Sequence, residues 1–532
     1  MPFYLGLDSS TQSLTASVLE VDGETRGIVF EHTFRFDDEF PEYGTTNGVL
    51  RGDDPREVWS SPLMWAAALD RMMAIVSREA GIDLTQLAAI SGSGQQHGSV
   101  YLTADGVTRL GTLDPRQPLA RQLEGALARD RSPVWMDDST RAQCDAIERS
   151  VGGAEALADL TGSSGIERFT GPQVRKFFER EPEAYGRTAR IHLVSSFMAS
   201  LLAGTDAPID PGDGAGMNLM DIRTRQWSER AMDATAPDLA GKLPQLRPSW
   251  AAAGTLAPYW QKRYGFGPAL VITWSGDNPC SLVGSGLVRE DSIAISLGTS
   301  DTVFALSREP RPTASGSHVF GAPTGDYMSL ICFKNGSLAR ERVRDKYGLD
   351  WKGFSRALAQ TQAGNRGALM LPWFEPEITP RVETPGVHTR NLDPSDAAAH
   401  VRAVVEGQMM SMANHADPVT GGEARRVLAT GGASANRAIL QVMADVFDAA
   451  VYQLPSGNSA CLGAALRAFH AHARSQDRDL PWEEAVRGFT EPVADSRVDP
   501  IPAHAAVYRS LRSDYAKLEC DVLATIRNST DR

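Results

Sequence analysis

Two distant segments of the chain share one pattern of hydrophobic and polar positions. An apolar run over residues 3–7 meets the hydroxyl-rich residues 8–13, apolar positions then continue to 19, and residues 293–306 repeat this order. Each segment predicts a strand, a tight turn and a returning strand. Such a turn gathers backbone N–H groups and small hydroxyls, which is typical of a site for phosphate oxygens. Two turns of this kind predict two similar lobes that hold one nucleotide between them.

The remaining pattern alternates between strand and helix signals, which favours an α/β fold with ligand-binding loops at strand ends. Strands are expected at 87–91, 270–274 and 426–429, and helices at 54–79, 335–346, 394–415, 437–446 and 460–472. We place the boundary between the lobes at Val288, so that residues 1–287 form the N-terminal lobe and 288–532 the C-terminal lobe. The pattern leaves open which lobe the segment from Leu480 onward contacts.

Composition narrows the classes of function. The chain has 532 residues, of which 42% are hydrophobic and 22% charged, as in ordinary soluble domains. A net charge of −13 without a basic stripe argues against a nucleic-acid partner. The five cysteines lie far apart, which favours reduced thiols over a disulfide framework or a zinc site. No basic leader and no membrane-spanning apolar run occur in the sequence, so we expect no membrane association and a cytoplasmic location.

Asp8 and Thr11 are the first candidates for chemistry. A carboxylate at the end of a strand, three residues before a threonine, can hold hydrated magnesium while the turn contacts phosphate. A simple Asx-turn would explain Asp8 equally well. The second hydroxyl-rich turn, at Thr299, favours the nucleotide interpretation.

The glycine pair Gly431 and Gly432, followed by Ala433 and Asn436, lies between an expected strand and an expected helix. Paired glycines allow the backbone to approach a ligand closely, and a helix N-terminus favours an electron-rich group. An ordinary strand-to-helix turn is the alternative. No GxxxxGK[S/T] P-loop and no dinucleotide fingerprint occur, so any nucleotide site must be of another kind.

Asp277, Asn278 and His97 are candidates for the substrate side. Asp277 lies in an expected turn after an apolar strand, where its carboxylate could take a proton from a hydroxyl that attacks phosphorus. Asn278 offers a donor and an acceptor to a polyol. His97 follows Gln95 and Gln96, and these amides suit sugar hydroxyls better than an apolar ligand. An Asx-turn at Asp277 and a structural histidine at 97 are the alternatives.

Together these segments resemble the FGGY carbohydrate kinases of the actin-like ATPase superfamily over nearly the whole chain. The resemblance is carried by residues 7–12, 91–98, 133–137, 167–171, 213–219, 276–279, 296–302, 332–337 and 429–434. Segments 95–98 and 167–171 are similar to the longer, animal-type members that act on xylulose. The resemblance implies an α/β fold of two actin-like (ribonuclease H-like) lobes with a central cleft.

The resemblance also implies an activity and a set of roles. MgATP would phosphorylate the C5 hydroxyl of D-xylulose, giving D-xylulose 5-phosphate and ADP; a kinase for ribulose, gluconate or glycerol, or a non-kinase actin-like ATPase, is the alternative. A homodimer is a possible assembly. The residues matched to the sugar site are His97, Arg168, Asp277 and Asn278, with Asp277 as the catalytic base. The residues matched to the ATP site are Asp8, Thr11, Thr299, Trp351, Gly431, Gly432, Ala433 and Asn436, with Asp8 as the Mg²⁺ ligand.

Overall fold

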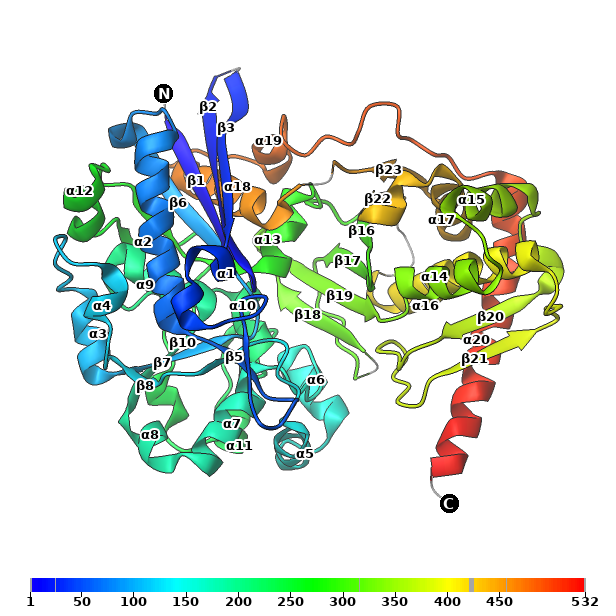
Figure 1. Ribbon diagram of the computed structural model, residues 1–532, viewed down its shortest axis with the longest axis horizontal. Coiled ribbons are helices and arrows are strands. Elements are labelled where there is room, and N and C mark those ends of the chain that lie inside the picture. Colours follow the sequence, from blue (N-terminus) through cyan, green and yellow to red (C-terminus); the bar gives the residue numbers. More distant parts are fainter. Residues whose placement is uncertain (1, 24, 315, 421–424, 456, 531–532) are drawn as a thin grey trace.

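The computed structural model describes residues 2–23, 25–314, 316–420, 425–455 and 457–530. Two lobes lie side by side: most of one is coloured blue to green and most of the other green to red, while the orange helices α18 and α19 lie against the first (Figure 1). Each lobe is built on one large mixed sheet.

The sheet of the first lobe has the strand order β13-β14-β6-β1-β2-β3. Strands β1, β2 and β3 form an antiparallel meander, whereas β6 runs parallel to both β1 and β14. The short strand β15 pairs with β6 beyond the residues of β6 that pair with β14. The bounds are β1 Phe3–Ser9, β2 Ser13–Asp22, β3 Thr25–Arg35, β6 Leu87–Gly94, β13 Ala252–Thr255, β14 Leu270–Ile272 and β15 Ser275–Gly276.

The sheet of the second lobe repeats this plan. Its order is β18-β19-β17-β16-β22-β23, with β19, β17 and β16 antiparallel and β16, β22 and β23 parallel. Five strands therefore correspond in order and direction between the lobes, which confirms the predicted α/β fold of two similar lobes. The bounds are β16 Ser292–Leu297, β17 Asp301–Ser307, β18 Ser317–Gly321, β19 Tyr327–Phe333, β22 Arg426–Thr430 and β23 Ala450–Gln453.

The central strand of each sheet is apolar on both faces because helices cover both sides. In β1, Leu5 and Leu7 pack into the core that contains helix α2, whereas Tyr4 packs into a second core with Leu466 and Phe469. Side chains of a strand alternate between its faces, so one short apolar run serves two cores.

Smaller strands and the helices complete the lobes. The remaining strands are β4 Leu50–Arg51, β5 Val58–Ser60, β7 Ser99–Thr103, β8 Leu127–Arg129, β9 Ser132–Pro133, β10 Thr188–Leu193, β11 Met220–Asp221, β12 Gln226–Trp227, β20 Leu369–Trp373 and β21 Gly386–Arg390. The helices up to residue 284 are α1 Phe36–Glu39, α2 Pro62–Glu79, α3 Ala104–Leu110, α4 Leu119–Gln122, α5 Arg141–Ser150, α6 Ala154–Thr161, α7 Thr170–Arg180, α8 Pro182–Arg187, α9 Val194–Ala203, α10 Pro211–Gly214, α11 Glu229–Thr235, α12 Pro258–Tyr264 and α13 Asp277–Gly284. Those that follow are α14 Ser337–Lys346, α15 Trp351–Gln360, α16 Ala397–Thr420, α17 Arg437–Phe447, α18 Ser459–Ser475, α19 Trp482–Val486 and α20 Pro502–Thr530.

One predicted helix begins in the wrong place. The pattern predicted a helix over 54–79, but residues 58–60 form strand β5 and α2 begins at Pro62. The amide of Val58 donates to the Asp137 carboxylate at 3.1 Å, a contact 79 residues away that no local pattern reveals. Proline at the first helical position then favours the later start. The other predicted helices are confirmed to within a few residues.

Helices α13 and α18, which follow the last strand of each sheet, pack against one another between the lobes (Figure 1). The contact requires glycine on both sides. A Cβ atom at Gly463 would lie 1.9 Å from the carbonyl oxygen of Cys280, and one at Gly284 would lie 1.8 Å from that of Ser459. The two lobes therefore meet at a close helix–helix contact.

The segment from Leu480 onward contacts both lobes. Helix α19 lies beside the first lobe, where Glu484 forms an ion pair with Arg26 at 2.6 Å. Helix α20 packs on α16 and α17 of the second lobe. Among the described residues, no helix combines the length and apolar character that a membrane crossing needs.

Candidate active site

Asp8 lies where parallel strands end together. The register of β1, β6 and β15 places Asp8, Ser93 and Ser275 in one row across the sheet. The Oδ1 atom of Asp8 is buried and has no hydrogen-bond partner among the described residues. Burial raises the pKa of Asp8 to about 7, opposed by the Ser93 hydroxyl and supported by the charge of Asp277. Asp8 thus offers one carboxylate oxygen, without a partner in the described part of the chain, at the C-terminal end of the central strand β1.

Asp277 begins helix α13 directly after β15. The expectation that it lies in a turn is therefore wrong in detail, because residues 277–284 continue as a helix. Burial raises the pKa of Asp277 to about 6, opposed by hydrogen bonds from the backbone N–H groups of Asn278 and Gln96. The backbone N–H of Asn278 donates to Asp277 Oδ1 at 2.8 Å. The hydrogen bonds to Oδ1 orient the carboxylate, and a pKa of about 6 favours its ionised form at neutral pH.

Gln96 connects Asp277 and Asn278 to His97. Its Oε1 accepts from Asn278 Nδ2 at 2.7 Å. His97 has the left-handed φ of +72° and stacks on the ring of Phe169, with the centroids 4.2 Å apart. Burial and the Arg168 charge hold the pKa of His97 well below its usual value, so the ring is neutral. Its Nδ1 lies 2.9 Å from the Gly216 carbonyl and therefore carries the proton, which leaves Nε2 as an acceptor.

Arg168 reaches from the first lobe to the second. Its Nη2 lies 3.3 Å from Nε2 of His318, which belongs to β18. Burial and the Arg168 charge lower the pKa of His318 to about 3, so this partner is neutral. No carboxylate pairs with Arg168 among the described residues. Its charge remains available to an oxygen-rich ligand between the lobes.

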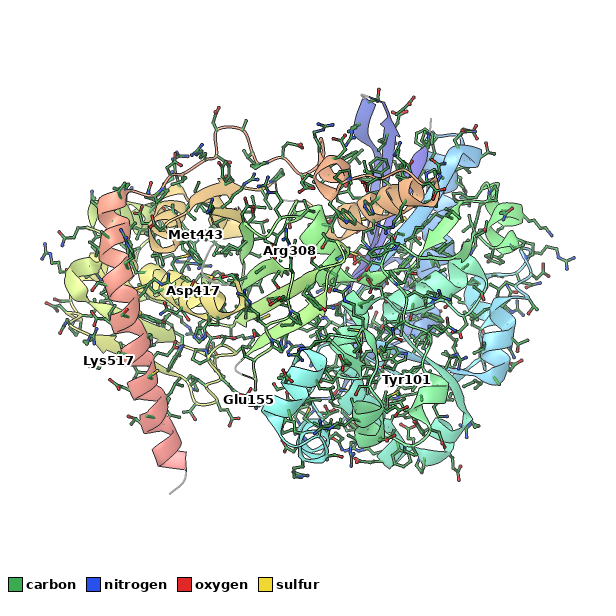
Figure 2. All side chains as sticks on the ribbon, turned by 180° about the vertical axis from the view of Figure 1, so that it is seen from behind. Tyr101, Glu155, Arg308, Asp417, Met443 and Lys517 are labelled. Carbon is green, nitrogen blue, oxygen red and sulfur yellow. The ribbon has the colours of Figure 1, made fainter. Side chains whose placement is uncertain are left out.

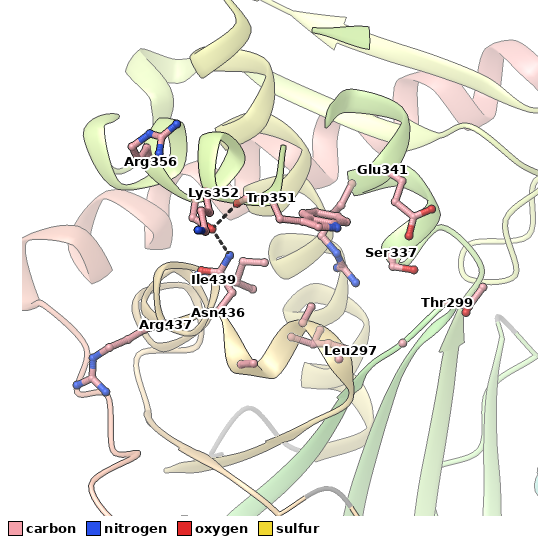
Figure 3. Close-up of a pocket in the computed structure, with 16 residues that line it drawn as sticks. Leu297, Thr299, Ser337, Glu341, Trp351, Lys352, Arg356, Asn436, Arg437 and Ile439 are labelled. Atoms are coloured by element: carbon pink, nitrogen blue, oxygen red, sulfur yellow. Dashed lines mark hydrogen bonds between the residues drawn. The ribbon is translucent and has the colours of Figure 1, made fainter. Parts of the chain in front are cut away.

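A cavity of about 970 Å³ lies in the second lobe between the β16–β17 turn and helices α14, α15 and α17 (Figure 3). Its volume suits a ligand of nucleotide size. Figure 3 shows Thr299 at one end of this cavity and Arg437 toward the other. Five of the predicted ATP-site residues line it: Thr299, Trp351, Gly432, Ala433 and Asn436.

Trp351 and Asn436 line this cavity, whereas Gly431 does not line it but forms the turn that precedes Gly432. Gly431 has a φ of +85°, and a Cβ there would lie 2.5 Å from the carbonyl oxygen of Leu297, so the turn requires glycine. Trp351 is 44% exposed and packs against the Arg344 guanidinium at 4.5 Å. Asn436 caps α17 by accepting from the Ala438 amide at 3.0 Å. One flat aromatic surface and one helix N-terminus thus face the same space.

The predicted residues fall into two groups. His97, Asp277 and Asn278 lie together around Gln96, and Asp8 is close enough to Asp277 for their charges to interact. Thr11 belongs to the same lobe, where its hydroxyl accepts from Trp135 Nε1 at 2.7 Å. Neither carboxylate, nor Thr11, lines the cavity beside Thr299. The structure therefore shows a cluster that contains Asp8 and Asp277 in the first lobe and a separate cavity in the second lobe.

Asp213 is a residue of the site to which the sequence assigned no role. It is buried, its Oδ2 accepts from the Ser195 hydroxyl, and its Oδ1 has no partner among the described residues. Burial raises the pKa of Asp213 well above its usual value, and the charges of Asp210 and Asp277 add to the effect. Its segment belongs to the resemblance, but its partners come from other parts of the chain and leave no local signal.

The residues around Asp8 indicate which kind of metal ion the site could bind. Among the described residues, no three His, Cys, Asp or Glu side chains gather as they would in an all-protein metal centre. A single carboxylate with a free oxygen fits Mg²⁺, which keeps several waters and binds through one or two carboxylates and substrate phosphates.

Two family models match the chain. The N-terminal domain model of the FGGY family of carbohydrate kinases matches residues 130–284, and the C-terminal domain model of that family matches residues 293–472. The chain belongs to the FGGY family of carbohydrate kinases, and the predicted resemblance is confirmed.

Individual relatives narrow the comparison. The chain is 43% identical to the xylulose kinase of Mus musculus over 537 residues, which cover 98% of this chain and 94% of the relative. A solved structure described as a xyloylose kinase from Brucella ovis has a TM-score of 0.82 at 21% identity, covering 98% of this chain and all of the other. A gluconate kinase from Lactobacillus acidophilus has a TM-score of 0.80 at 19% identity, covering 98% of each chain. The two-lobed actin-like fold is thus confirmed, but kinases named for different sugars share it.

Proposed function

We propose that this carbohydrate kinase transfers the γ-phosphoryl group of ATP to the C5 hydroxyl of D-xylulose, which gives D-xylulose 5-phosphate and ADP. The observation that carries the proposal is the oriented, ionised carboxylate of Asp277, beside Asn278 and close to the charge of Asp8. The 43% identity to a relative named xylulose kinase supports this choice of sugar.

Asp277 would act as the general base. An alcohol is a weak nucleophile, and a positioned base typically contributes about 10²–10⁴ in rate. Above a pH of about 6 the Asp277 carboxylate is ionised and can accept the proton of the attacking hydroxyl. Its backbone hydrogen bonds fix the direction from which that proton arrives.

The neighbouring side chains would bind the sugar. Asn278 offers an amide, neutral His97 offers Nε2 as an acceptor, and Arg168 offers a guanidinium without a carboxylate partner. These groups complement the mixed donors and acceptors of a polyol. Because Arg168 also contacts His318 of the other lobe, closure of the lobes would position it and exclude water, which competes with the sugar for the phosphoryl group.

The second lobe would bind ATP in the 970 Å³ cavity, with Trp351 beside the adenine and Thr299 toward the phosphates. Gly431 and Gly432 would let the backbone approach the nucleoside. Asp8 would hold Mg²⁺ through its free Oδ1, and Thr11 would contact phosphate in the facing turn. The bound ion would neutralise charge on the phosphate oxygens.

We extend the proposal to organisation and location. We assign residues 1–287 to a sugar-binding lobe and 288–532 to a nucleotide-binding lobe, a cytoplasmic location to the protein, and a homodimer as a possible assembly. The five cysteines, none of them in a disulfide, are consistent with a reducing compartment.

The test is ADP release from MgATP in the presence of D-xylulose, D-ribulose, L-xylulose, gluconate or glycerol. We expect the highest kcat/KM with D-xylulose and slow ATP hydrolysis without sugar. A preference for another polyol would overturn the choice of substrate. Sugar-independent turnover would instead favour a non-kinase ATPase.

A further inference from the structure

A second cavity lies in the first lobe, apart from the residues proposed for sugar and nucleotide. It has a volume of about 350 Å³ and is bordered by β5, β8, β9, α7 and α8, in the lower part of that lobe in Figure 1. In a chain with a net charge of −13, a local concentration of positive charge indicates an anionic ligand. The cationic side chains that line the cavity are Arg129, Arg131, Lys176, Arg180 and Arg187.

Arg129 is the least exposed of the four arginines that line the cavity. Its guanidinium lies 4.9 Å from the ring centroid of Phe177 and 5.5 Å from that of Tyr101, which Figure 2 labels within the first lobe. Its Nη1 is buried and has no hydrogen-bond partner among the described residues. The two rings hold the Arg129 guanidinium in place at the wall of the cavity.

Arg131 and Arg187 reinforce this interpretation. The guanidinium of Arg131 lies 4.6 Å from the ring centroid of Trp59, and this ring restricts its orientation. Neither arginine forms an ion pair with a carboxylate in the part of the chain that the structure describes. Three guanidinium groups without carboxylate partners therefore line one cavity.

Four carboxylates and five cationic side chains line the cavity, so the lining keeps one positive charge in excess. Glu57 is bound by Lys176 at 2.6 Å and by Arg180 at 2.9 Å. Asp137 is buried and accepts from the Val58 amide and from Gln173 Nε2. The other two, Asp130 and Glu181, are exposed to solvent, as Arg131 and Arg187 are.

A short segment joins the cavity to the first phosphate turn. Pro133 and Asp137 line the cavity, and between them Trp135 donates from Nε1 to the Thr11 hydroxyl at 2.7 Å. A ligand that shifts this segment would therefore shift the partner of Thr11.

We propose that this cavity is an effector site for a small phosphate-bearing anion, whose occupancy changes the affinity for MgATP through Trp135 and Thr11. Planar guanidinium forks match phosphate oxygens, and 350 Å³ suits a small molecule. The binding site stands on its own residues; only its coupling to MgATP rests on the proposed function of Thr11.

Calorimetric titration with inorganic phosphate, and separately with ribose 5-phosphate, tests the site. We expect one site that Arg131→Gln and Arg129→Gln each weaken about ten-fold or more, because each removes a charge-assisted hydrogen bond. Arg121→Gln, an exposed change on α4 outside the cavity, is the matched control and should bind as wild type does. Arg131 is exposed, so its variant should fold even where loss of the stacked Arg129 prevents folding.

The two ligands separate the sources of the anion. Equal affinities would identify free phosphate as sufficient, whereas binding of ribose 5-phosphate alone would identify a sugar phosphate. Absence of binding for both, or wild-type affinity in both arginine variants, would overturn the site.

The KM for MgATP, measured with and without the bound anion, tests the coupling. We expect a change of about five-fold or more in the wild type and none in Trp135→Phe, which keeps the cavity but loses the hydrogen bond to Thr11. An unchanged KM in the wild type would overturn the effector role. A change that persists in Arg131→Gln would indicate competition in the ATP cavity and would overturn it as well. The binding titration remains decisive even if no polyol proves to be a substrate.

Discussion

The two hydroxyl-rich turns lie between strands of the same arrangement, but the environments of their carboxylates differ. In the second turn, Asp301 and Arg340 are each 1% exposed and form a pair with contacts of 3.0 and 3.1 Å. Arg340 also donates to Gln408 at 2.9 Å. In the first turn, Asp8 has a buried oxygen without a partner among the described residues and a pKa raised to about 7.

On the proposed function, this difference separates a structural carboxylate, Asp301, from one that would take part in the reaction, Asp8. Burying a charge without a partner costs stability, and groups with strongly shifted pKa values cluster at functional sites. Burial raises the pKa of Asp213 and Asp277, in the same lobe as Asp8, and also that of Asp301. At Asp301 the Arg340 charge opposes this rise, and the pair joins the turn to helix α14 beside the cavity of the second lobe.

The largest expected effect is on Asp277. Asp277→Asn keeps the size of the side chain but removes the base, so we expect kcat with D-xylulose to fall by about 10²–10⁴. Nucleotide binding, measured by titration with ADP, should stay within about two-fold of wild type because Asp277 does not line the ATP cavity. Turnover close to that of the wild type would remove Asp277 from the mechanism.

Exchanging the two turn carboxylates for asparagine sharpens the comparison. Asp301→Asn leaves Arg340 buried without a charge partner, so we expect the free energy of unfolding to drop by about 3–5 kcal/mol. Asp8→Asn should abolish most activity without loss of stability. Chemical denaturation of both variants in EDTA is the measurement, and equal destabilisation would contradict the distinction.

The stability difference at Asp8 should depend on pH. The pKa of Asp8 is about 7 in the folded protein and near 3.8 in the unfolded chain, so the contribution of Asp8 to stability falls as the pH rises from about 4 to 7. Asp8→Asn lacks this titration and should become more stable than the wild type across that interval. A difference independent of pH would show that Asp8 is not buried as a charge.

Catalysis should follow the titration of Asp277. Below a pH of about 6 its carboxyl group is protonated and cannot accept a proton, so kcat/KM for D-xylulose should fall about ten-fold or more per pH unit, and more steeply where Asp8, with a pKa of about 7, also loses its charge. The measurement is a pH–rate profile, with the denaturation midpoint at each pH as the control for unfolding. A profile that is flat from pH 7 to 5 would exclude this base.

The sequence was sufficient for most of the fold because its signals are local. The two hydroxyl-rich turns predicted two similar lobes, the Gly431–Gly432 pair predicted where a strand ends, and the family resemblance supplied the actin-like fold. The correspondence of five strands between the lobes could not be read from the sequence, because it lies in strand order and direction and not in residue identity. The start of α2 was predicted too early because Val58 forms its hydrogen bond with Asp137, which is distant in the chain.

The site was predictable to a different extent. His97, Asp277 and Asn278 could be singled out because each follows a strand, but Arg168 and Trp351 came only from the resemblance. The roles of all these residues stay predictions. Asp213 was missed because its unusual state arises from burial and from Ser195, Asp210 and Asp277, none of which a local pattern connects to it. Electrostatic environment is a property of the folded chain.

The smallest expected effects separate the two lobes by substrate. Trp351→Ala removes an exposed flat ring from the ATP cavity, so we expect the KM for MgATP to rise about ten-fold while the KM for D-xylulose stays within about two-fold. Trp351→Phe is the matched control, because it keeps an aromatic surface beside Arg344. Arg168→Ala should raise the KM for D-xylulose about ten-fold and leave the KM for MgATP within about two-fold. Arg168 is one of the residues proposed to bind the sugar. If both variants raised both KM values equally, the lobes would not divide the substrates, and the contrast between the two turns would lose its functional meaning.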